Sequence, residues 1–158
     1  MNQRLNILLA VIVLCLLALC YMSVCAPLRF DAQREQREQS VKERLVQIRQ
    51  AEEAYRRANG AYAGDFSELV SAGLLADSLQ YVPHGHGQRF VLSATMQTGK
   101  SGQPLPLMEC AAPYESFLGD LDARAVAALV EEAQKAGRYA GLKIGDLLMP
   151  NNNAGNWE

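Results

Sequence analysis

The stretch Val41–Gly60, VKERLVQIRQAEEAYRRANG, decides the fold that we expect for this chain. It carries an apolar side chain every three or four residues, which is the spacing of one face of an α-helix. Gly60 can end the helix, because glycine readily adopts a left-handed conformation. The stripe predicts either packing on a sheet of the same chain or self-packing between copies, as in a short parallel coiled coil. The residues expected to mediate self-packing are Val41, Leu45, Ile48 and Tyr55.

Upstream of this stripe, residues 31–40 (DAQREQREQS) are polar on every side of a helix. The sequence from Phe30 to Ala58 contains no Gly or Pro and is rich in strong helix formers, whereas Pro27 should kink or interrupt the helix. A fully polar turn cannot pack in a core, so we interpret it as a solvated spacer or a surface for partner contact. The basic residues expected to contribute to that contact are Arg34, Arg37 and Lys42.

The first part of the chain is apolar, and Leu5–Cys25 holds almost nothing polar. Its length gives roughly 31 Å of helix, which matches a hydrocarbon core of about 30 Å. The sequence therefore predicts residues 1–26 as an N-terminal tail and transmembrane anchor, followed by a stalk helix at 27–59. A cleaved signal peptide and a lipoprotein signal are the alternatives. Basic residues on both sides of the span leave its orientation open.

Downstream of Gly60 the pattern changes to short elements, which predict a small α+β domain over residues 60–149. Two successive extended runs predict an antiparallel hairpin, and GLKIGDLL at 141–148 can return to the same sheet. The last residues, 150–158, have no periodicity and should be irregular. The predicted helices cover residues 66–72 and 123–136, and the predicted strands cover residues 89–96 and 105–111.

Composition and motifs argue against several functions. The net charge is −2 and only 7% of the residues are aromatic, so the footprint of a nucleic-acid-binding protein is missing. TGKS at 98–101 lacks the upstream glycine and the following helix of a nucleotide-binding loop. His84 and His86 supply only half of a metal site. Cys110 is the one cysteine after residue 25, so no disulfide is expected there. We expect no cofactor, no metal, no nucleotide and no enzymatic activity.

The run AEEAYRRANGAYAGDFSELVSAGLL, residues 51–75, resembles type IV pilins and the pseudopilins of secretion systems. In those families an aromatic residue near the end of the long helix precedes a Gly, Tyr, Leu and Gly-Leu pattern. The resemblance implies an apolar N-terminal helix that continues into an amphipathic helix laid on an antiparallel sheet with a C-terminal helix. The motif cleaved by prepilin peptidase is absent. The matching residues are Tyr55, Gly60, Tyr62, Leu69, Gly73 and Leu74.

The end of the chain, GLKIGDLLMPNNNAGNWE, also resembles a family of bacterial single-pass envelope proteins. Together the two resemblances imply a protein of the inner membrane with its C-terminal domain in the periplasm. The expected function is that of a non-enzymatic assembly or scaffold subunit of an envelope or secretion machine, with the lipid bilayer, other envelope proteins and copies of itself as partners.

Two other classes of function stay open at this stage. The chain can be an anchored binding module or an adaptor that faces the cytoplasm. In either case it would bind a ligand or partner through the His84–His86 loop or through Trp157 in the tail. Trp157 can equally fold back over apolar surface. A membrane-bound enzyme is the third class, and it would need a concave polar pocket.

Overall fold

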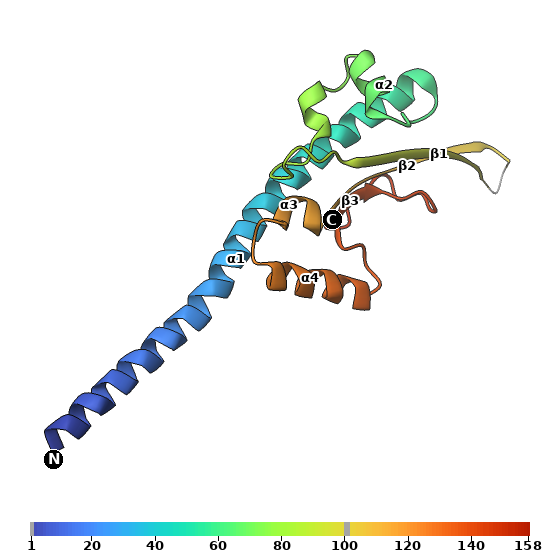
Figure 1. The fold of residues 1–158 in the computed structure, drawn as a ribbon. Helices are drawn as coiled ribbons and strands as arrows, with labels where there is room; N and C mark the ends of the chain where they lie inside the picture. Colours follow the sequence, from blue (N-terminus) through green and yellow to red (C-terminus); the bar gives the residue numbers. More distant parts are fainter. Residues whose placement is uncertain (1, 100–101) are drawn as a thin grey trace. The chain divides into compact units, whose positions relative to one another are not determined.

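The computed structural model describes residues 2–99 and 102–158, with the backbone alone described at residues 2, 4, 5 and 22–27. The chain divides into two compact units, residues 1–35 and residues 36–158. The first unit is helical. The second, referred to below as the α+β domain, holds the sheet, the shorter helices and the last part of the long helix (Figure 1).

Helix α1 runs from Asn2 to Asn59. The sequence predicted that Pro27 would kink or interrupt the helix. The helix instead continues through residue 27 without a break. The helix ends where the sequence indicates. Gly60 has a φ of +76° and donates its N–H to the carbonyl of Arg56 at 2.8 Å, which caps the last turn.

The predicted transmembrane anchor is corrected by the structure. Among the described residues, no helix contains a stretch that is both long and apolar enough to span a bilayer. Residues 5 and 22–25 of the predicted span lie outside the described side chains. The predicted transmembrane helix, the single-pass membrane assignment and the inner-membrane localisation are therefore wrong.

The α+β domain contains a three-stranded antiparallel sheet. Strand β1 (Val91–Thr98) pairs with β2 (Pro104–Pro113), and β2 pairs with β3 (Gly141–Gly145), in the order β1-β2-β3. The two predicted strands form this hairpin with boundaries shifted by one or two residues, and the segment at 141–148 returns to the sheet. Val91 lies opposite Ala111, and Thr98 lies opposite Pro104, so the register is unbroken along β1.

Four shorter helices complete the domain among its described residues. Helix α2 (Phe66–Ser71) starts at Asp65, whose carboxylate accepts the N–H of Ser67, and α4 (Ala123–Lys135) starts at Asp122, whose carboxylate accepts the N–H of Ala125. Aspartate is a preferred N-cap because its side-chain oxygen can accept an N–H of the first turn. The 3₁₀-helix η1 (Asp77–Gln80) and the single-turn helix α3 (Tyr114–Leu118) were not predicted, because neither is long enough to show a period.

The core of the domain includes the stripe of α1. Val41, Leu45 and Ile48 are each 0% exposed. Side chains from α2, β2, α3 and β3 are buried in the same domain. The stripe therefore packs within its own domain, which was one of its two predicted uses. Fully buried members from those elements include Leu69, Met108, Phe117, Leu118 and Ile144.

Candidate functional site

A buried carboxylate lies in the last part of α1. Glu52 is 0% exposed, and its Oε2 accepts the backbone N–H of Ala63 at 2.9 Å. Among the described residues, its Oε1 has no hydrogen-bond partner. Burial raises the pKa of the carboxyl to about 7; the hydrogen bond from Ala63 opposes the rise, and the charge of Glu68 adds to it. Glu52 therefore holds the turn after α1 against the helix. The free-energy cost of burying its carboxyl depends on pH, because the ionised form is the costlier one to bury.

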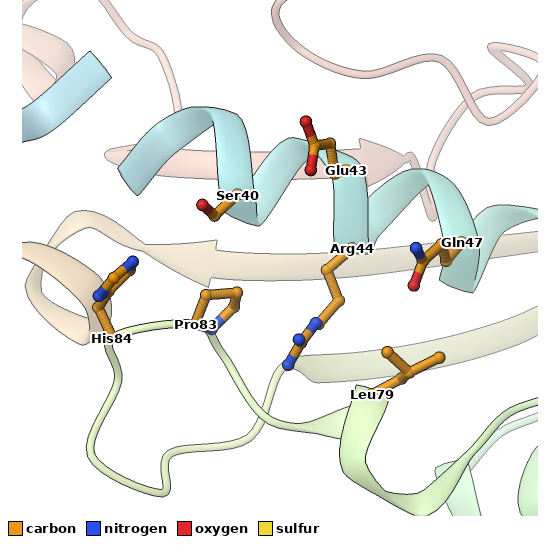
Figure 2. A pocket seen from close by; sticks show the side chains of 7 residues that line it. All are labelled: Ser40, Glu43, Arg44, Gln47, Leu79, Pro83 and His84. Carbon is orange, nitrogen blue, oxygen red and sulfur yellow. The ribbon is translucent and has the colours of Figure 1, made fainter. Parts of the chain in front are cut away.

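A polar hollow of about 350 Å³ lies between α1 and the segment that follows η1 (Figure 2). Its central cation is Arg44, whose Nη1 donates to the carbonyl of Tyr81 at 2.9 Å and to that of Ser78 at 3.3 Å. Two of the five donors that a guanidinium offers are directed at main-chain carbonyls. We therefore assign Arg44 the task of holding this segment against α1. The hollow is lined by Ser40, Glu43, Arg44, Gln47, Leu79, Pro83 and His84.

The His84–His86 loop has an unusual backbone. His84 and His86 have φ values of +59° and +48°, in the left-handed region that non-glycine residues rarely adopt. Gly85 between them is buried, and a Cβ there would lie 3.0 Å from the carbonyl oxygen of Ser116. The loop is closed by a hydrogen bond from the N–H of Val82 to the carbonyl of Gln88 at 2.8 Å. Gly85 thus lies close to the backbone of Ser116, and the two histidines that flank it both adopt the left-handed conformation.

An ion pair joins α1 to the turn after α3. The Arg37 guanidinium donates to both carboxylate oxygens of Asp120 and also to the carbonyl of Phe117 at 2.8 Å. The hydrogen bond from Arg37 lowers the pKa of Asp120 to about 2, and the charge of His86 contributes to the same shift. Arg37, predicted as a partner contact, is thus engaged within its own domain.

The other residues predicted for interaction occupy several environments. Tyr55 is half-buried and donates its hydroxyl to Glu68 at 2.8 Å. Arg34 is partly exposed on α1. Lys42 forms an i,i+4 ion pair with Glu38 at 3.5 Å, and its Nζ lies 6.0 Å from the ring centroid of the half-buried Trp157. Lys42 and Trp157 therefore lie near each other, while Val41, Leu45 and Ile48 share the buried stripe of α1. Because Val41, Leu45 and Ile48 have no exposed surface, they offer nothing to a second copy in this conformation.

The tail is fixed to the domain by polar contacts that the sequence did not indicate. Arg49 donates to the carboxylate of Glu158 at 2.9 Å and to the carbonyl of Asn153 at 3.2 Å. Inside the fold, the side-chain amide of Asn153 donates to the hydroxyl of Tyr62 at 2.7 Å. These contacts hold the tail so that Trp157 lies against α1. Of the two interpretations of Trp157, the structure matches the one in which it folds back onto the domain.

The His84–His86 loop precedes β1, and the TGKS motif begins at the last residue of that strand. No three His, Cys, Asp or Glu side chains of residues 2–99 and 102–158 cluster closely enough to hold a metal ion. Lys100 and Ser101 of the TGKS motif lie outside the described residues, and Thr98 is the last residue of β1.

The first unit carries the largest exposed apolar surface among the described side chains. Between residues 7 and 21 of α1, the large apolar side chains are 46–70% exposed. They include the consecutive residues Ile7–Leu9 and Val11–Leu14, and a helix turns by about 100° at each residue, so every face of this segment is apolar. We refer to residues 7–21 as the apolar segment.

Comparison of the chain with protein families, with curated proteins and with solved structures finds no match.

Proposed function

We propose that the protein is a non-catalytic assembly subunit, in which copies of the chain associate through the apolar segment of α1. The observation that carries the proposal is the exposure of this segment. Side chains such as Leu14 (70% exposed), Leu17 (64%) and Leu19 (64%) would stay in water in a single chain. Burying a leucine side chain stabilises an assembly by roughly 1.5–3 kcal/mol, so association has a large driving force.

The distribution of these side chains favours a particular kind of assembly. A helix with one apolar stripe can bury it in a dimer, whereas a helix that is apolar all round needs neighbours on every side. The apolar segment belongs to the second kind. The proposal is therefore a bundle of more than two helices, formed by the apolar segments of several copies.

The contacts inside the α+β domain favour a structural role for this domain. The thiol of Cys110 is 0% exposed, and burial raises its pKa well above the usual value, which disfavours the reactive thiolate. Glu52 is buried, and Arg44 is hydrogen-bonded to main-chain carbonyls. Glu52, Arg44 and Arg37 each bond to another segment of the same domain, as residues that stabilise a fold do.

Sedimentation velocity on the full chain tests the proposal. The variant Leu9→Glu/Leu14→Glu places charges on two faces of the apolar segment, and we expect it to shift the chain from oligomers of three or more copies toward monomer or dimer. The matched control Gln33→Glu/Gln36→Glu adds the same charge to exposed polar positions of the same helix and should leave the oligomers intact. A monomeric wild-type chain, or equal masses for the two variants, would overturn the proposal.

A further inference from the structure

The two outer edges of the sheet, at β3 and at β1, differ in how their backbone groups are hydrogen-bonded. The outer edge of β3 is covered by the tail: the N–H of Gly145 donates to the carbonyl of Ala154 at 3.1 Å, and the N–H of Asn156 donates to the carbonyl of Lys143 at 3.0 Å. Ile144 also forms an isolated bridge with Gly155. Among the described residues, the backbone groups of β1 pair with β2 alone. The outer edge of β1 is therefore open along its length (Figure 1).

Strand β1 lacks the features that normally protect an open edge. Its sequence, VLSATMQT, contains no charged residue and no proline, and its eight residues pair one to one with β2 without a bulge. Val91 and Met96 are 60% and 50% exposed. Proteins usually protect edge strands with lysine, proline or bulges, since an unprotected edge is a template for another strand. The open edge of β1 thus has the chemistry of a strand-pairing site.

We propose that β1 pairs antiparallel with β1 of a second copy of this chain, so that two three-stranded sheets join into one. An antiparallel pair of identical strands is related by a two-fold axis perpendicular to the sheet, and the same residues are buried on both sides. Like charges directly opposite each other would oppose such pairing. None can arise here, because β1 carries no charge.

The extent of the free edge locates the two-fold axis. The N–H of Phe90 donates to the carbonyl of Gln80 at 3.0 Å, so the segment before β1 is already bonded within the chain. The free run is therefore 91–98, and its middle lies at Ala94 and Thr95. Each strand would bring an exposed Thr95 close to the axis, where a substitution acts twice.

This contact is separate from the apolar segment of α1, and it does not rest on the function proposed above. It involves only the α+β domain, and it uses backbone hydrogen bonds in place of apolar side chains. With both contacts present, strand pairing would link one helix bundle to another.

The test uses the full chain with Leu9→Glu/Leu14→Glu as background, so that association through the apolar segment is weakened. Added to this background, Thr95→Lys puts two like charges beside the axis, while Thr95→Gln is a neutral control of similar length. Across a concentration series in sedimentation velocity, we expect the background and the Thr95→Gln chain to form dimers and the Thr95→Lys chain to stay monomeric. A monomeric background, or a Thr95→Lys chain that dimerises like Thr95→Gln, would overturn the proposal.

Charge complementation gives a second measurement. Thr95→Lys and Thr95→Glu chains should each be monomeric alone and should form a one-to-one heterodimer when mixed, because opposite charges then meet at the axis. Hydrogen exchange should show added protection at alternate amides of residues 91–98 in the dimer and none in the monomer. Capture of a different protein's strand without self-pairing would likewise contradict the proposal, since it would make β1 a site for another partner.

Discussion

The carboxylate of Glu52 accepts the main-chain N–H of Ala63 inside the core, at 2.9 Å, across the turn that ends α1. One carboxylate oxygen is used in this way, and the other has no partner among the described residues. The turn gains a fixed position against the helix, and the fold carries the cost of a buried carboxyl. That cost grows with ionisation, and it makes the stability of the domain sensitive to pH.

The substitution Glu52→Gln should remove this pH dependence. The pKa of Glu52 rises from 4.5 in the unfolded chain to about 7 in the fold. Between these values the folded chain holds a proton that the unfolded chain has lost, so the free energy of unfolding falls as pH rises through this window, by up to roughly 3 kcal/mol. Glutamine cannot ionise, and it keeps an oxygen for Ala63. Urea unfolding at several pH values between 4 and 8 should show a smaller decline for the variant.

The neighbouring Glu53 provides the control for this experiment, because Glu53→Gln makes the same chemical change on a side chain that is not fully buried. Between pH 4.5 and 7, the free energy of unfolding of Glu53→Gln should fall with pH as steeply as that of the wild-type chain. Parallel slopes for wild type and Glu52→Gln would show that the buried carboxyl does not titrate in this range.

For Glu52, the sequence could predict the burial of the side chain but not its hydrogen-bond partner. Its position, three or four residues from Ile48 and Tyr55 and seven from Leu45, places it on the buried face of α1, so its burial could have been predicted from spacing alone. Its bond to Ala63 could not, because that contact depends on how the turn after Gly60 folds back. The strands, α2 and α4 were predictable because periodicity and capping residues are local signals.

The tail shows the opposite case. Asn153 and Tyr62 are 91 residues apart and form a buried hydrogen bond at 2.7 Å, yet NNNAGNWE has no periodic pattern. Contacts of this kind arise from tertiary packing, to which propensity and spacing are blind. The same limit explains why Arg37 was predicted to face a partner: its acceptors, Asp120 and the Phe117 carbonyl, come from the other end of the sequence.

The substitution Tyr62→Phe should destabilise the domain by about 1–2 kcal/mol, since it leaves the buried amide of Asn153 without its acceptor. Tyr55→Phe is the control, because its hydroxyl bond to Glu68 is exposed and its loss should change the free energy of unfolding by less than about 0.5 kcal/mol. Chemical denaturation at one pH measures both. Equal effects of the two substitutions would mean that the tail does not stabilise the domain through Asn153.

The ion pair between Arg37 and Asp120 should contribute to the loss of stability at acidic pH. The pKa of Asp120 falls from 3.8 in the unfolded chain to about 2 in the fold, so the contribution of this carboxylate is complete above pH 3.8 and is lost as pH falls through about 2. Asp120→Asn should therefore flatten the decline of stability between pH 4 and 2. Arg37→Ala should have a larger effect at neutral pH, because it also removes the donor to the Phe117 carbonyl. Circular dichroism during acid titration compares the variants.

Cys110 should react with thiol reagents only when the α+β domain opens. The side chain is 0% exposed, burial raises the pKa of its thiol well above the usual value, and the negative charge of Glu52 adds to that rise. In a Cys15→Ser/Cys20→Ser/Cys25→Ser chain, Cys110 is the one remaining thiol, and its labelling at pH 7 should be at least about 10³-fold slower than in urea, following the small population of open molecules. The control adds Cys110→Ala and Gln134→Cys, which moves the thiol to an exposed position on α4 and should label quickly in both conditions. Fast, complete labelling of Cys110 without denaturant would contradict its burial and would return this thiol to the candidates for chemistry.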